Sequence, residues 1–235
     1  MRTKNPITCL FLDIGGVLLT NGWDHHERQR AAEHFKLDWA EMNNRHNLTF
    51  DTYEEGKISL AEYLERVVFY KKRAFTFAQF RSFMFAQSQP CAPMLDLIPR
   101  LKAKYGLKII VVSNESRELN THRIRTYKLS AFVDSFISSC FVHLRKPDAD
   151  LYRLALDMAQ APVGQVLYIE NTPMFVQVAE SLGIHSILHT DYHSTKMKLA
   201  SFGLPDDPDA DETARRWTRH GMPDAKVPAG KGVIA

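Results

Sequence analysis

The sequence predicts an α/β fold with a parallel sheet and a helical segment inserted after the first strand. Short apolar runs at residues 7–12, 108–112 and 165–169 each stop at polar residues. Helical patterns lie between the later runs, an alternation typical of strand–helix–strand units. Between about residues 23 and 89 only helical signals occur. Together these observations favour a layered sheet with an all-helical insertion.

Composition excludes several classes of protein. The chain has 235 residues, 45% of them hydrophobic and 24% charged, as in ordinary globular proteins. A net charge of +3 does not indicate a nucleic-acid or membrane partner, and no apolar run has transmembrane length. Cys9, Cys91 and Cys140 are scattered, as is typical of reduced thiols. We expect a cytoplasmic monomer or homodimer that binds neither nucleic acid nor membranes.

The first strand ends at a charge. Residues 7–19 read ITCLFLDIGGVLL, so the strand stops at Asp13 and Gly15-Gly16 follow. In open parallel sheets, ligands bind at the carboxyl ends of the strands. Taken alone, a carboxylate after a strand is more often a turn residue. The assignment of Asp13 therefore depends on the rest of the chain.

The helical insertion carries two capping boxes. Ser59 with Glu62, and Thr76 with Gln79, have the spacing at which side chains satisfy the free backbone donors of a helix start. Prolines at about residue 90 end the segment. We predict a helical cap domain at residues 21–90 that lies over the strand ends. The core would then comprise residues 1–20 and 91–204.

The next strand follows a glycine-capped helix. Gly106 is a good C-terminal cap for the helix before it. The run at 108–112 is β-branched, as buried parallel strands require, and it stops at Ser113-Asn114. A helix is expected over 117–127 and a weaker strand over 132–138.

The last part of the core repeats this pattern. Pro147 is predicted to open a helix, with an apolar face made of Leu151, Leu154, Ala155 and Met158. A strand at 165–169 stops at Glu170-Asn171, and Thr172 is predicted to cap the helix that follows. A short strand at 184–188 comes next. Residues 205–235 lack apolar periodicity, which predicts a mobile tail.

Four polar positions stand at the ends of these segments. They are Asp13, Ser113-Asn114, Lys146 and Glu170-Asn171. Because parallel strands end at one rim, we expect these side chains to lie close together. A carboxylate, a hydroxyl, an ammonium and a second carboxylate suit an aspartyl-phosphate mechanism.

In these segments the chain resembles the haloacid dehalogenase-like (HAD) hydrolase superfamily. The resemblance rests on FLDIGGVL, IIVVSN, LRKPDADLY and VLYIENTPMFVQVAESLG, in this order. YEEGKISLAEYL and HTDYHSTKMKLASFGL resemble the branch with a small helical cap (subfamily IA, variant 3). That branch contains sugar-phosphate phosphatases and the phosphatase-like domain of soluble epoxide hydrolase. The resemblance covers about residues 7–204.

The resemblance implies a Rossmann-like core and a role for each position. Asp13 would be the nucleophile, Ser113 and Asn114 would bind the phosphoryl group, and Lys146 would neutralise its charge and orient Asp13. Mg²⁺ would be held by Asp13, the carbonyl oxygen of Gly15 and Glu170, in keeping with its preference for oxygen ligands. The implied substrate is a small phosphorylated metabolite.

The chain departs from the family pattern at two positions. Gly15 stands where the phosphatases usually have a second aspartate, so the general acid is lost. Asn171 stands where a second metal-loop aspartate is common. Two alternatives stay open: a metal-free haloacid dehalogenase, and a non-catalytic protein that binds a phosphorylated ligand or a partner. Glu115 is expected to face solvent.

Residues near the predicted hinge leave their role open. Trp23, His25, His26 and Arg28 follow the nucleophile loop. They could contact an anionic or sugar substrate, and a solvated first turn of a cap helix explains them equally well. His143 and Arg145 beside the lysine loop have the same two interpretations.

Overall fold

A five-stranded parallel sheet forms the centre of the protein, as predicted. The structure is a computed structural model, and it describes residues 6–206. The strands lie in the order β3-β2-β1-β4-β5, and every neighbouring pair is parallel. Their bounds are β1 Cys9–Leu12, β2 Lys108–Ser113, β3 Ser135–Ser138, β4 Val166–Glu170 and β5 His185–Leu188.

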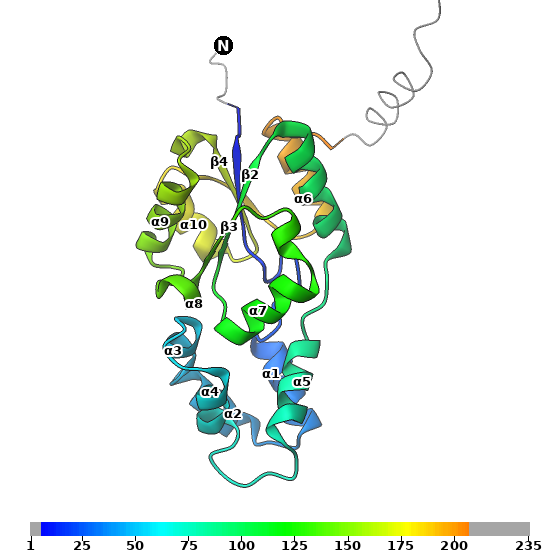
Figure 1. Cartoon of the computed structure of the whole chain (residues 1–235), viewed down its shortest axis with the longest axis vertical. Coiled ribbons are helices and arrows are strands. Elements are labelled where there is room, and N and C mark those ends of the chain that lie inside the picture. Colours follow the sequence, from blue (N-terminus) through cyan, green and yellow to red (C-terminus); the bar gives the residue numbers. More distant parts are fainter. Residues whose placement is uncertain (1–5, 207–235) are drawn as a thin grey trace, which may run out of the picture. The chain divides into compact units, whose positions relative to one another are not determined.

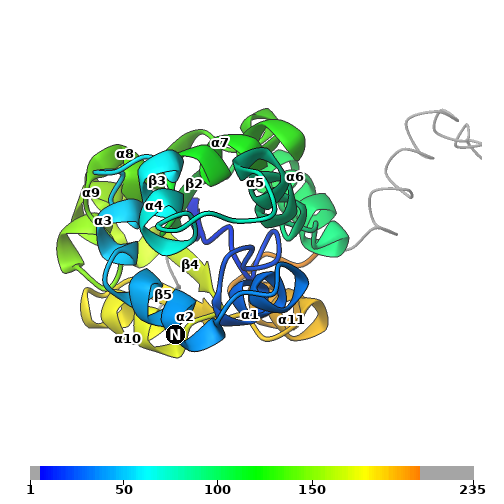
Figure 2. The same cartoon turned by 90° about the horizontal axis from the view of Figure 1, so that it is seen from below.

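Side chains of the central strands alternate between two hydrophobic clusters. In β1, Cys9 and Phe11 face one cluster and Leu10 and Leu12 face the other, as the two-residue period of a strand requires. The first cluster lies under α9 (Ala149–Ala159) and α10 (Pro173–Ser181), the second under α6 (Ala92–Tyr105) and α11 (Tyr192–Ser201). Figures 1 and 2 show these helix pairs on opposite faces of the sheet.

The segment after the first strand is helical, as predicted. It consists of α1 His25–His34, α2 Trp39–Asn47, α3 Phe50–Glu54, α4 Leu60–Val67 and α5 Phe77–Ala86. Both capping boxes are present. These helices share a third hydrophobic cluster rich in aromatic rings, and they lie at the lower end of Figure 1. We retain residues 21–90 as a proposed cap domain.

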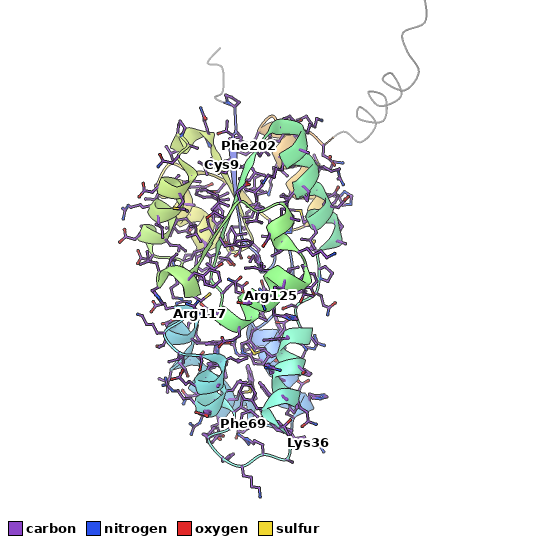
Figure 3. All side chains as sticks on the ribbon, in the orientation of Figure 1. Cys9, Lys36, Phe69, Arg117, Arg125 and Phe202 are labelled. Atoms are coloured by element: carbon purple, nitrogen blue, oxygen red, sulfur yellow. The ribbon has the colours of Figure 1, made fainter. Side chains whose placement is uncertain are left out.

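The remaining described elements connect the sheet layers. They are α7 Arg117–Thr126, η1 Leu129–Ala131, α8 Ser139–Val142 and η2 Val163–Gln165. Gly106 adopts the left-handed conformation, with φ of 65°, and ends α6 as predicted. Figure 3 labels Arg117 and Arg125 on α7, between the sheet and the cap helices.

Some boundary predictions are wrong. Pro147 does not open a helix, because α9 begins at Ala149, where the carboxylate of Asp148 accepts from the Asp150 N–H at 2.9 Å. Met158 does not belong to the apolar face. Its side chain is 51% exposed, and Tyr152 is buried on that helix instead.

One further helix was not predicted, and one prediction falls almost entirely outside the described residues. Helix α11 was not expected, although Asp191 caps it by accepting from the Ser194 N–H. The predicted mobile tail lies outside the described residues, apart from its first two. In the described part of the chain, no helix has the length and hydropathy needed to cross a membrane.

Candidate active site

The candidate site lies where β1 and β4 end. The chain leaves β1 toward α6 on one face of the sheet and enters β4 from α9 on the other, which makes this the topological switch point. Asp13 follows directly after β1, and its backbone N–H donates to the Ile169 carbonyl at 3.1 Å. Ser113 ends β2 and Glu170 ends β4. Parallel register therefore brings the predicted side chains to one rim.

Lys146 joins the two carboxylates. Its Nζ lies 3.1 Å from Asp13 Oδ1 and 2.6 Å from Glu170 Oε2, and the side chain is 1% exposed. Burial disfavours the ammonium charge, but the carboxylates of Asp13 and Glu170 outweigh it and raise the pKa of Lys146. The three side chains together carry a charge of about −1 when all are ionised.

Asp13 is buried and its acidity is altered. Burial raises the pKa of its carboxyl group to about 6, while Lys146 and the hydroxyl of Ser113 act in the opposite direction and Glu170 adds to the rise. Ser113 is 1% exposed, and its Oγ accepts from the Ile14 N–H at 3.5 Å. The carboxylate is thus presented in a largely desolvated position beside a hydroxyl.

Asn114 holds the lysine loop in place. Its side-chain oxygen accepts from the Lys146 backbone N–H at 2.8 Å, and its nitrogen donates to the Lys146 carbonyl at 2.9 Å. This amide pairs with both backbone groups of one residue, so the end of β2 fixes the position of Lys146. Asn114 also lines the pocket described below.

Glu170 is surrounded by donors. Oε2 accepts from Lys146 and from the hydroxyl of Tyr168, and Oε1 accepts from the Thr172 N–H at 2.8 Å. The orientation of the Asn171 amide follows from the donors and acceptors around it. Its nitrogen donates to Glu170 Oε1 at 2.9 Å and to the Gly15 carbonyl at 3.3 Å. Asn171 therefore lies directly against two of the predicted metal ligands.

The oxygen atoms at this position suit a magnesium ion. Within residues 6–206, no cluster of three or more His, Cys, Asp or Glu side chains could hold a metal. A magnesium site would therefore combine the two carboxylates of Asp13 and Glu170, the Gly15 carbonyl and water. Such a set matches the ion's preference for oxygen ligands and retained waters, and the excess negative charge favours a cation.

A pocket of about 420 Å³ opens above Asp13. Its walls come from the strand-end loops, from Trp23 before α1 and from cap helices, including His25 and Arg28 of α1, whereas His26 is not among its lining residues. Arg28 is 8% exposed, and its Nη1 donates to the Trp23 carbonyl at 2.9 Å. Among the described residues, no carboxylate forms an ion pair with Arg28. The buried guanidinium thus faces the pocket without a direct ion pair, although the charges of Asp24, Glu27 and Glu54 act on it from a longer distance.

Three polar cap residues form a chain beside this guanidinium. Trp23 Nε1 donates to the Tyr63 hydroxyl at 3.0 Å, and that hydroxyl lies 2.8 Å from His46 Nδ1. The Tyr63 hydroxyl can donate its proton to Nδ1 of a neutral imidazole that carries its own proton on Nε2. Burial, and secondarily the charge of Arg28, lowers the pKa of His46 to about 3. His46 also lines the pocket.

The residues that flank Lys146 contact the cap. Arg145 pairs with Asp51 and with Glu54, the latter at 2.7 Å, while it also lines the pocket. His143 Nδ1 lies 2.6 Å from the Glu55 carbonyl. Both residues thus join the lysine loop to the segment around α3.

The expectation that Glu115 faces solvent is wrong. Its side chain is 3% exposed and pairs with the equally buried Arg123, because the turn after β2 directs it inward. Burial raises the pKa of Glu115 to about 7, against the effect of Arg123. Tyr168 was also missed, although it lies two residues before Glu170 on the same face of β4, a spacing that could have identified it.

Comparisons with known proteins agree with this geometry. The family model of haloacid dehalogenase-like hydrolases matches residues 7–183. A candidate pyrophosphatase, PpaX, of Caldanaerobacter subterraneus is 26% identical over 39% of this chain and 41% of its own length. Bifunctional epoxide hydrolase 2 of Sus scrofa is 28% identical over 46% of this chain and 20% of its own length. The matches thus span less than half of these relatives.

Solved structures show the same fold. A HAD family enzyme from Bacteroides thetaiotaomicron, crystallised with magnesium and inorganic phosphate, has a TM-score of 0.63 and 21% identity, covering 77% of this chain and 93% of its own. An L-2-haloacid dehalogenase has a TM-score of 0.55 and 19% identity, covering 77% and 82%. The family model covers most of the chain, and the strand order and strand-end residues fit it. The chain therefore belongs to the haloacid dehalogenase-like hydrolases.

Proposed function

We propose that the chain is a magnesium-dependent phosphatase that acts through an aspartyl-phosphate on a small phosphorylated metabolite. The observation that carries this proposal is the contact of one buried ammonium, Lys146, with the carboxylates of Asp13 and Glu170 at the floor of the pocket. An ammonium between a nucleophile and a metal ligand offsets the charge of an incoming phosphoryl group. The pocket volume suits a small metabolite.

In the first step, a carboxylate oxygen of Asp13 bonds to phosphorus as the bond to the leaving oxygen breaks. The electron pair of that bond stays on the leaving oxygen, which takes a proton from water. Lys146 and the hydroxyl of Ser113 bind the phosphoryl oxygens. In the second step, water attacks phosphorus, inorganic phosphate leaves, and Asp13 is restored. Magnesium bound by Asp13, Glu170 and the Gly15 carbonyl would supply further charge neutralisation.

Gly15 narrows the class of substrate. Because no carboxyl group at this position can protonate the leaving oxygen, leaving groups that depart unaided are favoured. Anomeric phosphates and acyl phosphates belong to this class. Positioned proton transfer raises the rate by about 100- to 10,000-fold, and this gain matters most for simple alkyl phosphates. Arg28 adds a preference for a substrate with a second anionic or strongly polar group at its cap end.

A second candidate is metal-free dehalogenation of a 2-haloacid, with Asp13 attacking carbon. The observation that favours it is the set of protein donors around both oxygens of Glu170, which satisfies this carboxylate without a cation. Asp13 would displace halide to form an ester, and water would then attack the ester carbonyl. The lack of a general acid at Gly15 does no harm in this reaction, because halide leaves without a proton.

Hydrolysis of acetyl phosphate and para-nitrophenyl phosphate, with Mg²⁺ or with a chelator, tests the proposal. Neither substrate needs a strong general acid. Turnover that requires Mg²⁺ and disappears in Asp13→Asn is the expected result. No phosphate release under any condition, together with halide release from a 2-haloacid, would replace the phosphatase by the dehalogenase.

A further inference from the structure

Two short segments connect the core with the cap helices, and they lie against each other. We call residues 19–22 and 87–91 the hinge. The backbone N–H of Thr20 donates to the Gln89 carbonyl at 2.9 Å, and its hydroxyl donates to the Gln87 carbonyl at 2.6 Å. Leu19 and Pro90 also form an isolated antiparallel bridge. Any displacement of the cap relative to the sheet must pass through this pair of segments.

Arg123 of α7 holds both hinge segments. Its Nε donates to Ser88 Oγ at 3.0 Å, and its Nη2 donates to the carbonyls of Thr20 at 3.1 Å and Asn21 at 2.7 Å. The side chain is 1% exposed. Hydrogen bonds from a charged donor to a carbonyl oxygen are stronger than those between neutral groups. One guanidinium of the core therefore ties the outgoing and returning segments of the cap.

The hinge leaves room for this guanidinium only because residue 22 is glycine. Gly22 has φ of +81°, and a Cβ there would lie 1.6 Å from Nη2 of Arg123. One turn further along α7, the hydroxyl of Tyr127 donates to the Ser88 carbonyl. Both hinge segments thus contact α7, the outgoing one at Gly22 and the returning one at Ser88.

The other partner of Arg123 lies at the active site. Glu115 pairs with Nη1, follows the Ser113-Asn114 pair and lines the pocket. Its backbone N–H donates to Ser139 Oγ at 2.9 Å, and that hydroxyl donates to the Glu54 carbonyl of α3 at 2.7 Å. The loop after β2 is therefore bonded to the hinge through Arg123 and to the far side of the cap through Ser139.

We propose that Arg123 is a positioning residue, held by Glu115, that keeps the cap seated over Asp13. Buried ion pairs are a poor source of net stability, because removing both charges from water offsets their attraction. The arrangement instead has a geometric consequence: pocket residues of the cap, such as Trp23 and Arg28, keep their distance from the strand-end loops. This proposal rests on the proposed phosphatase function for its kinetic readout, but not for its structural one.

Hydrogen exchange followed by mass spectrometry on the full chain provides the structural test, comparing wild type with Arg123→Lys. Lysine keeps the charge opposite Glu115 but cannot reach both hinge segments. We expect about tenfold faster exchange in peptides that cover the hinge, from the loss of strong hydrogen bonds, with β1 and β4 unchanged. Arg125→Lys, an exposed position on the same helix (Figure 3), is the matched control and should behave as wild type.

Kinetics with para-nitrophenyl phosphate test the positioning role. In Arg123→Lys, we expect KM to rise about tenfold while kcat changes less than threefold, because substrate binding uses the cap and the chemistry uses the core. A fall in kcat as large as the rise in KM would overturn the proposal. Hydrogen exchange in the hinge at the wild-type rate would also overturn it. If wild type releases no phosphate, the proposed function fails, and hinge exchange still decides the structural part.

A milder pair of variants covers the case in which Arg123→Lys does not fold. Ser88→Ala and Tyr127→Phe each remove one hinge contact and leave the Arg123–Glu115 pair in place. Both should speed exchange in the peptide around residues 87–91 and leave that around 19–22 nearly unchanged. Unchanged exchange at 87–91 in Ser88→Ala, which removes the contact of Arg123 with this segment, would contradict the proposal.

Discussion

Lys146 is the residue on which the charges of the site depend. The buried ammonium stays charged because the two carboxylates beside it favour the charged form more than burial disfavours it. Replacing it with methionine, Lys146→Met, leaves two buried carboxylates without a cation. We expect this change to lower the free energy of unfolding by about 3–5 kcal/mol, measured by urea denaturation.

A second variant serves as the control for Lys146. In the double variant Lys146→Met with Asp13→Asn, one of the unpaired carboxylates is gone, so part of the lost stability should return. Purely additive losses in the double variant would show that the carboxylate and the ammonium are not energetically coupled.

Gly15 has room for a Cβ atom, and its neighbour Gly16 does not. A Cβ at Gly15 would lie 3.5 Å from the nearest atom, Asn21 Cα, which is ordinary contact. We expect Gly15→Asp to restore a general acid and to speed hydrolysis of alkyl phosphates by about 100-fold. Acetyl phosphate hydrolysis should change little, because its leaving group needs no proton. Steady-state rates with both substrates measure the difference.

Gly16 supplies the matched control for this prediction. With φ of +71°, and a Cβ that would lie 2.0 Å from the end of the Asn171 amide group, this position cannot accept a side chain without strain. Gly16→Ala should lower stability and activity with every substrate. An equal effect of Gly15→Asp on alkyl and acyl phosphates would contradict the assignment of a missing acid.

Asn171 limits the affinity for magnesium in this account. Its amide nitrogen faces Glu170 Oε1 and the Gly15 carbonyl, two proposed ligands. Asn171→Asp replaces that donor with a carboxylate, so we expect the Kd for Mg²⁺ to fall about tenfold through Coulomb attraction. Titration calorimetry measures the change, with Asn171→Ala as the control. The placement of the metal would be contradicted if Asn171→Ala bound Mg²⁺ more tightly than wild type, or if Asn171→Asp did not.

At the scale of elements, the stability of the cap helices depends on a buried histidine that must stay neutral. The pKa of His46 is about 3 in the folded protein, below its value of about 6.5 when unfolded. Its contribution is therefore fully present above pH 6.5 and is lost as pH falls from 6.5 toward 3. Relative to His46→Asn, wild type should lose about 2 kcal/mol of unfolding free energy between pH 7 and pH 5.

Urea unfolding at these two pH values measures this difference. Asparagine can accept the hydrogen bond from Tyr63 without titrating, so the comparison isolates the imidazole. Parallel losses in wild type and His46→Asn would show that His46 does not remain neutral in the folded cap.

Helices and strands followed from local patterns, and the exceptions have local reasons. The capping boxes of α4 and α5 and the glycine end of α6 depend on neighbours in sequence, so they were predictable. The start of α9 was misplaced because the carboxylate of Asp148 caps the helix two residues after Lys146. Helix α11 was missed although Asp191 provides a cap of the same kind.

At the scale of the whole molecule, the sequence predicted the strand-end site because parallel register brings Asp13, Ser113 and Glu170 to one rim. It did not predict the burial of Glu115. That burial depends on Arg123 and on hinge carbonyls about 100 residues away in the chain. Contacts of this length follow from the tertiary fold, not from local patterns. The position of Arg28 beside the pocket also depends on the tertiary fold.

The central claim is that Asp13 forms a covalent bond to phosphorus. The most direct measurement is mass spectrometry of the protein after rapid acid quenching with acetyl phosphate and Mg²⁺. We predict one phosphoryl group on the peptide that contains Asp13, absent in Asp13→Asn and in the presence of chelator. No adduct, or an adduct on another residue, would contradict an aspartyl-phosphate at Asp13. The dehalogenase, in which Asp13 forms an ester with carbon, would then be the better candidate.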